Sequence, residues 1–221
     1  MDLELQNYTL FDKIGESIKS IIYRAKSNID DDPRIIKILK SNHLSYDEIS
    51  RYKQEYEILR KMHLKHSIKI YDIIENYNGL ALILEDFNGE TLKEYLINET
   101  INIKTFLKIA INLSHTVGEL HEVNIIHNDI KPSNILINKT TLETKIIDFG
   151  ISNQVQLNKI NNTYEETIHG TLIYMSPEQT GRINRNIDYR TDIYSLGITL
   201  YELLTGTVPY VSFEAIDIIH S

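Results

Sequence analysis

Residues 127–134 read His127-Asn128-Asp129-Ile130-Lys131-Pro132-Ser133-Asn134, and Asp148-Phe149-Gly150 follows them. Transfer of a phosphoryl group needs a carboxylate that orients the attacking hydroxyl and accepts its proton, together with oxygen ligands for magnesium. Asp129, Asn134 and Asp148 supply these groups, with the two aspartates nineteen residues apart. Lys131 can neutralise charge on the transferred group. The structural alternative is a polar turn followed by a helix end.

This arrangement resembles the catalytic core of the eukaryotic-type Ser/Thr protein kinase superfamily, and the resemblance extends over residues 8–210. The family motif is usually His-Arg-Asp, and here the middle residue is Asn128. The resemblance implies an α+β, bilobal fold with ATP and Mg²⁺ as cofactors. It implies Asp129 as the catalytic base, Lys131 as the charge-stabilising residue, and Asn134 and Asp148 as the magnesium ligands.

The first third of the chain is expected to hold strands and one helix. The capping-box pattern Ser45-Tyr46-Asp47-Glu48 starts the helix, which runs to about Met62 with an apolar stripe. Asn78-Gly79 predicts a hairpin turn between the last two strands. The expected strands cover residues 8–14, 21–26, 34–39, 68–75 and 80–85. The expected stripe of the helix is Ile49, Tyr52, Tyr56, Leu59 and Met62.

Lys37 lies where the family has its third-strand lysine, so the resemblance implies that it binds the α- and β-phosphates. Its partner in the family is a glutamate on the following helix. At about 100° per residue, Glu55 falls within the apolar stripe beside Tyr52 and Leu59. A carboxylate on an inward face needs a cation, and Lys37 is the candidate. The alternative is an exposed helical glutamate.

The phosphate-binding loop departs from the family pattern Gly-x-Gly-x-x-Gly, because Gly15 alone keeps a glycine. Ser17 is small and can hydrogen-bond a phosphate, but a serine resists positive φ. A generic hairpin turn is the alternative interpretation of this segment. The resemblance also implies nucleotide contacts from Ile14 and Ile22. Ile35 stands where the family usually has an alanine against the adenine ring.

The segment Leu84-Glu85-Asp86-Phe87 matches the family's hinge between the lobes. The resemblance implies that the backbones of Glu85 and Phe87 hydrogen-bond adenine, that Leu84 is the gatekeeper, and that Leu136 lies below the ring. Both the loop and Ile35 depart from the family pattern, which favours a weaker nucleotide site.

Downstream, residues 170–178 resemble the end of a Ser/Thr kinase activation segment, where Thr171 contacts the catalytic aspartate and lysine. Asp192 matches the aspartate that braces the catalytic loop. Asn128 offers no charge to a phosphorylated activation segment. Residues 176–182 and 188–192 suggest a narrower resemblance, to the N-terminal kinase-like domains of large hybrid sensor histidine kinases that also carry an ATPase module.

The expected domains are a small β-rich kinase N-lobe at 1–87 and a mainly helical C-lobe at 88–221. Helical spacing of apolar residues predicts one helix near 106–120 and a buried helix at 192–204. The C-lobe looks truncated, since the family has further helices and an arginine that pairs with Glu178. A partner, or a missing C-terminal region, would then cover the lower C-lobe. The first helix is expected to bury Phe106, Ala110, Leu113, Val117 and Leu120, and the second to leave Tyr194, Ile198 and Tyr201 open.

Composition narrows the class of protein. The 221 residues carry a formal net charge of −8, which gives no electrostatic case for nucleic acid or an anionic membrane surface. There is no cysteine, which excludes disulfides and thiolate metal sites and fits a cytoplasmic location. The longest clean apolar run, Leu80 to Leu84, is too short to span a bilayer. His63 and His66 have no evident third ligand for zinc.

The sequence therefore predicts an ATP- and magnesium-dependent kinase that phosphorylates Ser or Thr hydroxyls of a protein substrate in signal transduction. Two alternatives stay open. A nucleotide-binding pseudokinase or interaction module is favoured by the degraded glycine loop and Ile35. A small-molecule phosphotransferase shares the same superfamily, although Lys131 and Ser176-Pro177-Glu178 favour a protein substrate.

Overall fold

The computed structural model describes residues 5–40, 45–62, 64, 66–76, 79–150, 152–154, 172–180 and 185–210. The chain forms two compact units, Met1–Asn88 and Gly89–Ser221. A β-sheet dominates the first unit and helices dominate the second, as expected for an α+β kinase fold. Asn78 of the expected hairpin turn lies outside the described residues, whereas the strands on either side of it pair with each other.

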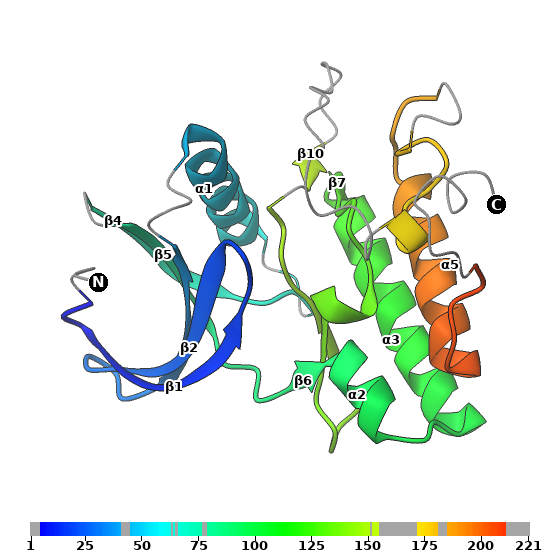
Figure 1. The fold of residues 1–221 in the computed structure, drawn as a ribbon, viewed down its shortest axis with the longest axis horizontal. Helices are drawn as coiled ribbons and strands as arrows, with labels where there is room; N and C mark the ends of the chain where they lie inside the picture. The colour runs from blue at the N-terminus through cyan, green and yellow to red at the C-terminus, as the bar shows by residue number, and fades with distance from the viewer. Residues whose placement is uncertain are drawn as a thin grey trace. The chain divides into compact units, whose positions relative to one another are not determined.

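The first unit is built on a five-stranded antiparallel sheet with the strand order β1-β2-β3-β5-β4 (Figure 1). Helix α1 packs against strands β4 and β5. Residues Ala25, Ile36, Ile38, Ala81 and Ile83 form a buried core on one face of the sheet. Neighbouring residues of a strand point to opposite faces, so Lys37 faces the other side. The strands and helix are β1 (Tyr8–Glu16), β2 (Ser20–Ser27), β3 (Pro33–Leu39), α1 (Tyr46–Lys61), β4 (Ile70–Asn76) and β5 (Gly79–Glu85).

Helix α1 begins at the predicted cap. The Ser45 side chain accepts a hydrogen bond from the Glu48 backbone N–H at 3.3 Å, which satisfies one of the free donors of the first turn. The Glu48 side chain does not complete the capping box and instead accepts from Lys19 at 2.7 Å. The buried face also differs from the expected stripe, because Ile58 is buried where Tyr56 is only half-buried.

Strand β1 continues through Gly15, which was expected to end it, and reaches Glu16. Its register with β2 shifts between Leu10 and Lys13 and again between Lys13 and Gly15. Such irregularities bend a strand and increase its twist without ending the pairing. The glycine is therefore part of a continuous strand that leads into the turn before β2.

The second unit combines helices with short strands. The three-stranded sheet has the order β6-β8-β9, and β7 pairs with β10. Helices α3 and α5 lie side by side (Figure 1). Among the described residues, no helix has the length and apolar character needed to cross a membrane. The elements are β6 (Glu90–Thr91), α2 (Leu92–Asn98), α3 (Ile103–Glu122), β7 (Ile125–Ile126), η2 (Pro132–Asn134), β8 (Ile135–Ile137), β9 (Thr144–Ile146), β10 (Asn153–Gln154), η3 (Leu172–Tyr174) and α5 (Arg190–Thr205).

The buried face of α3 lies slightly round the helix from the predicted stripe. Leu113, Val117 and Leu120 are buried as expected. Ile109 is fully buried, whereas Phe106 and Ala110, which were expected inside, are half-buried. Periodicity alone could not choose between these adjacent apolar positions, because both fit a 3.6-residue repeat.

Helix α5 is less enclosed than its apolar sequence predicts. Ile198 was expected to face water and is buried, while Tyr201 is 46% exposed as expected. Ile193 and Leu204, each more than half exposed, extend the open face of the helix. The helix ends at Gly206, whose φ of 75° is left-handed and whose N–H donates to the Glu202 carbonyl.

Candidate active site

The expected catalytic loop leaves strand β7 and ends in η2, and His127 anchors its start. This histidine is fully buried, with its ring edge-on to Phe149 at 4.8 Å between centroids. Its Nε2 lies 3.1 Å from the Ile147 carbonyl, which can only accept, so Nε2 carries the hydrogen. Nδ1 then accepts the Asp129 backbone N–H at 3.3 Å. The ring thus fixes the backbone that carries Asp129.

Two predicted site residues bind the carboxylate of a third, Asp129. The Lys131 ammonium donates to both of its oxygens, at 2.7 and 2.9 Å. The Asn134 Nδ2 donates to Oδ2 at 2.7 Å and to the Asp129 carbonyl at 2.9 Å. Charge-assisted hydrogen bonds of this kind hold a carboxylate in one orientation. The structure therefore brings Asp129, Lys131 and Asn134 together, as their proposed roles require.

Burial is the main reason that the pKa of Asp129 is raised above its ordinary value. Lys131 acts in the opposite direction by its charge and its hydrogen bond, and His127 lowers the pKa further. The nearby Asp148 carboxylate adds a smaller upward contribution. A raised pKa makes the ionised Asp129 carboxylate a better proton acceptor than that of an ordinary aspartate.

Asp192, at the start of α5, braces this loop from inside the unit. It is fully buried, and its Oδ2 accepts the His127 backbone N–H at 2.9 Å while Oδ1 accepts that of Asn128 at 2.8 Å. His121 of α3 adds a third contact, with Nε2 2.9 Å from Oδ2. Asn128 has φ 67°, a left-handed conformation that asparagine tolerates better than most residues. The sequence indicated Asp192, whereas nothing in it pointed to His121.

The two expected metal ligands have the chemistry that magnesium prefers. Asn134 uses its Nδ2 toward Asp129, so its amide oxygen points away from that carboxylate and offers an oxygen ligand. Asp148 is exposed, with φ 68°. Among the described residues there is no group of three or more His, Cys, Asp or Glu side chains placed to hold a metal. Two oxygen ligands suit Mg²⁺ that arrives with phosphates, because this ion keeps several waters and is bound by few protein groups.

In the first unit, Lys37 and Glu55 form the pair that the sequence predicts. The Lys37 Nζ lies 2.9 and 3.2 Å from the two Glu55 carboxylate oxygens. Glu55 is 2% exposed, and the Tyr52 ring lies 5.2 Å from the Lys37 nitrogen. The pair is therefore desolvated and fixed, as a phosphate-binding lysine needs to be.

The turn between β1 and β2 is closed by serine rather than by glycine. The Ser17 Oγ accepts the Ser20 backbone N–H at 3.0 Å and lies 2.9 Å from the Ser20 hydroxyl. Gly15 does not have a positive φ, and neither does any other residue from 13 to 20. Ser17 therefore avoids the cost that a serine would have at positive φ. The Ser17 hydroxyl bonds within its own turn, and its contact with a phosphate stays a prediction.

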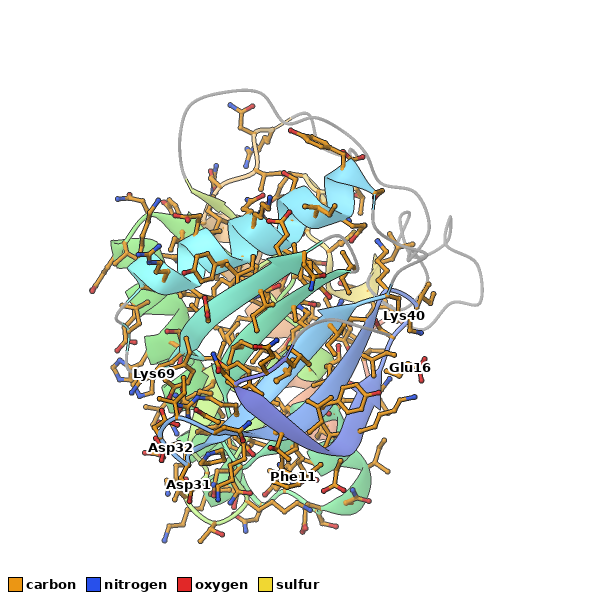
Figure 2. All side chains as sticks on the ribbon, turned by 90° about the vertical axis from the view of Figure 1, so that its left-hand side faces the viewer. Phe11, Glu16, Asp31, Asp32, Lys40 and Lys69 are labelled. Atoms are coloured by element: carbon orange, nitrogen blue, oxygen red, sulfur yellow. The ribbon has the colours of Figure 1, made fainter. Side chains whose placement is uncertain are left out.

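Ion pairs fasten the same turn to the rest of the first unit. Glu16 pairs with Lys13 and, at 2.6 Å, with Lys40 after strand β3; Figure 2 labels Glu16 and Lys40. These cations lower the pKa of Glu16 to about 2, through the Lys13 hydrogen bond first and the Lys40 hydrogen bond second. On either side of the turn, Ile14 is exposed and Ile22 is half-buried.

The expected hinge residues lie at the end of β5. Leu84 is buried and opposite Ile35 in the sheet. The Glu85 backbone N–H donates to the Lys69 carbonyl at 3.0 Å. Phe87 is half-buried in the first unit. In the second unit, Leu136 is half-buried in β8.

Helix α5 binds the end of the expected activation segment through hydrogen bonds. Thr171 of that segment lies outside the described residues. We call residues 174–180 the docked segment. Tyr174 at its start binds two residues of α5. Its carbonyl accepts the Ser195 hydroxyl at 2.7 Å, and its own hydroxyl donates to Glu202 at 2.6 Å. Burial and then the Glu202 bond raise the pKa of Tyr174, so this phenol keeps its hydrogen. The sequence did not predict these contacts.

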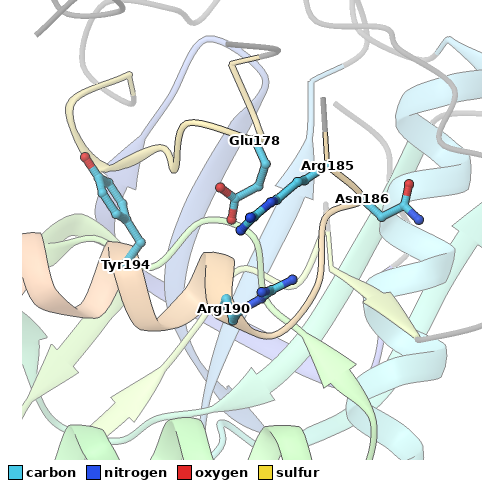
Figure 3. A pocket seen from close by; sticks show the side chains of 5 residues that line it. All are labelled: Glu178, Arg185, Asn186, Arg190 and Tyr194. Carbon is cyan, nitrogen blue, oxygen red and sulfur yellow. The ribbon is translucent and has the colours of Figure 1, made fainter. Parts of the chain in front are cut away.

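Glu178 was expected to lack a partner, because the family's arginine has no counterpart after residue 190. Instead its Oε1 accepts the Thr191 hydroxyl at 3.0 Å. It also lines a pocket of about 190 Å³ in which the Arg185 side chain points toward the Glu178 carboxylate (Figure 3). Asn186, Arg190 and Tyr194 complete the lining. Residues just before α5 and in its first two turns thus surround the Glu178 carboxylate.

Comparison with known proteins gives one family and relatives of that family. The family model described as "Protein kinase domain" matches residues 8–220. Serine/threonine-protein kinase PrkC of Bacillus subtilis is 33% identical over 96% of this chain and 32% of its own length. Serine/threonine-protein kinase PknL of Mycobacterium tuberculosis is 31% identical, over 96% of this chain and 52% of its own. Probable serine/threonine-protein kinase PknB of Lactococcus lactis is 30% identical, over 96% and 33%. The chain thus spans about a third to a half of these relatives.

Proposed function

The chain belongs to the protein kinase domain family, and from that premise we propose that it transfers the γ-phosphoryl group of ATP to Ser or Thr hydroxyls of a protein substrate in signal transduction. One observation carries the proposal: the half-buried Asp129 carboxylate is oriented by Lys131 and Asn134 on a loop that Asp192 braces. A carboxylate held in this way supports a role in phosphoryl transfer.

In the proposed reaction, the Asp129 carboxylate accepts a hydrogen bond from the attacking hydroxyl and then takes its proton as the new P–O bond forms. Lys131 stabilises negative charge on the transferred group, because its ammonium lies beside the Asp129 carboxylate that binds the attacking hydroxyl. ADP leaves with the electron pair of the broken P–O bond. Thr171 is proposed to contact Asp129 and Lys131, although it lies outside the described residues.

The family generally uses ATP and Mg²⁺, and we assign both to this chain as proposals. Asn134 and Asp148 would hold the ion through oxygen atoms, and Mg²⁺ would neutralise charge on the phosphates. Lys37, held by Glu55, would bind the α- and β-phosphates. The remaining residues proposed to contact the nucleotide are Ile14, Gly15, Ser17, Ile22, Leu84, Glu85, Phe87 and Leu136.

A narrower assignment is also proposed. The motifs near residues 176–192 support an N-terminal kinase-like domain of the kind found in large hybrid sensor histidine kinases, with its N-lobe at 1–87 and its C-lobe at 88–221. The exposed apolar face of α5, with Ile193, Tyr201 and Leu204, supports a partner or a further region of the chain that covers it. The negative charge and the lack of cysteine support a cytoplasmic protein that does not bind nucleic acid.

One assay distinguishes the proposed function from two alternatives. A pseudokinase would bind nucleotide without turnover, and a small-molecule phosphotransferase would prefer a free alcohol. The chain is incubated with radiolabelled ATP, magnesium and either a casein-type protein or small alcohols and aminoglycosides. We expect label on Ser and Thr of the protein acceptor. Label on a small acceptor alone, or nucleotide binding with no label at all, would favour one of the alternatives.

The pH dependence of turnover tests the role of Lys131. Since protonation removes the base, turnover is expected to fall as pH drops through the raised pKa of Asp129. Lys131 lowers that pKa, so Lys131→Ala is expected to move the acid limb of kcat/KM to higher pH, besides lowering kcat. The measurement is kcat/KM over about pH 5 to 8.

Lys139→Ala is the matched control, because Lys139 lies in the same unit and pairs with Glu90 at 2.9 Å, on the surface. Its acid limb is expected to coincide with that of the unaltered chain. An acid limb in Lys131→Ala that stays at the original pH would contradict the assignment of Asp129 as the titrating base.

A further inference from the structure

The first turn of α5 contacts two functional segments through adjacent residues. Thr191 holds the docked segment: its hydroxyl accepts from the Ser176 hydroxyl at 3.2 Å and donates to Glu178 at 3.0 Å. Asp192, the next residue, holds the catalytic loop through the backbone N–H groups of His127 and Asn128. The docked segment and the catalytic loop therefore share one rigid support.

Gln179 connects the two segments directly. Its amide Nε2 donates to the Asn128 carbonyl at 2.8 Å, across 51 residues of sequence. Its Oε1 accepts the Ser176 backbone N–H at 3.0 Å and lies 3.3 Å from the Ser176 hydroxyl. The orientation of the amide is set by these partners, because the reverse orientation would place Nε2 against the Ser176 backbone N–H and Oε1 against the Asn128 carbonyl oxygen.

The carbonyl that Gln179 binds belongs to the peptide that leads into Asp129. Asn128 is 3% exposed and has the left-handed φ of 67°. Its N–H is held by Asp192 and its carbonyl by Gln179, so both peptide planes beside this residue are fixed. A single rotation of the second plane would move the Asp129 carboxylate relative to Lys131.

We propose that Gln179 is a positioning residue, which couples the seating of the docked segment to the orientation of the catalytic base. The coupling is made of neutral hydrogen bonds, so it needs no phosphate and no arginine before Asp129. The position of the docked segment and the orientation of the base are thereby fixed together in the unmodified chain. This inference rests on the proposed kinase function.

The test compares Gln179→Glu with Gln179→Met. Glutamate keeps the acceptor for Ser176 but places an oxygen against the Asn128 carbonyl, whereas methionine removes both bonds at similar length. Gln6→Glu is the control, since it makes the same chemical change on an exposed side chain of the first unit. The readouts are kcat and KM for ATP with a protein acceptor, and hydrogen exchange of the catalytic-loop peptide by mass spectrometry.

For Gln179→Glu and Gln179→Met we expect kcat to fall by about tenfold, with KM for ATP within about twofold, and exchange in the catalytic loop to become faster. Relative to the unaltered chain at the same pH, lowering the pH should partly restore the kcat of Gln179→Glu but not that of Gln179→Met, because a protonated carboxyl can donate. Unchanged kcat and unchanged exchange in both variants would overturn the inference. If the unaltered chain shows no turnover but the variants still accelerate exchange, the kinase proposal fails while the coupling of the two segments stands.

Discussion

Asp129→Asn is expected to lower the rate of phosphoryl transfer by about 10² or more while the chain still binds nucleotide. The amide keeps the shape of the side chain but cannot accept the proton of the attacking hydroxyl. It also loses the charge that Lys131 and Asn134 bind at 2.7 Å. The measurement is kcat with a protein acceptor, together with the affinity for ATP by calorimetry.

Lys37→Ala supplies the contrast for this experiment. Lys37 belongs to the other unit and pairs with Glu55, so its loss is expected to weaken nucleotide binding as well as turnover. A base and a phosphate ligand thus give different patterns in kcat and in affinity. Wild-type turnover in Asp129→Asn would mean that the catalytic loop has been assigned to the wrong residues.

Asp192→Ala is expected to have the largest effect on folding. The carboxylate is fully buried and accepts two backbone N–H groups, from His127 and Asn128, besides contacting His121. Its removal leaves buried donors without a partner, at about 1–3 kcal/mol each. We expect the free energy of unfolding to fall by about 3–5 kcal/mol, measured by chemical denaturation, and turnover to be lost with the loop geometry.

Asp188→Ala is the control for this change. Asp188 lies four residues earlier and binds Arg190 at 2.6 Å at the surface, where ion pairs contribute little. The denaturation midpoint is expected to change little in this variant. If Asp192→Ala and Asp188→Ala unfold at the same denaturant concentration, the three contacts of Asp192 do not stabilise the catalytic loop.

Local patterns explain the features that the sequence predicted well. A helix start depends on the few residues that can bind free N–H groups, so Ser45 could be identified as the cap of α1. Helical periodicity placed Glu55 on the inner face, and the need to neutralise a buried carboxylate pointed to Lys37. The sequence placed Asp129 and Asn134 in one loop, and the structure joins them by hydrogen bonds.

Local patterns failed where two adjacent choices were equally apolar or where a partner was distant. Ile109 rather than Ala110 is fully buried in α3, and Ile198 of α5 is covered although its sequence surroundings do not show what covers it. Ser17 resembled a substitute for a glycine, yet its hydroxyl closes the turn through Ser20. In each case, packing and hydrogen-bond geometry decided among options that the sequence left equivalent.

The sequence by itself determined the family, the α+β architecture and the residues able to carry the chemistry, because these follow from short-range spacing and residue type. Only the tertiary structure decided how those residues are held. His121 and Asp192 are 71 residues apart, and Gln179 and Asn128 are 51 apart. No local preference encodes such pairs, since each polar group has many possible partners until burial leaves it one. The orientation of the Asp129 carboxylate is therefore set by the folded chain and not by its motif alone.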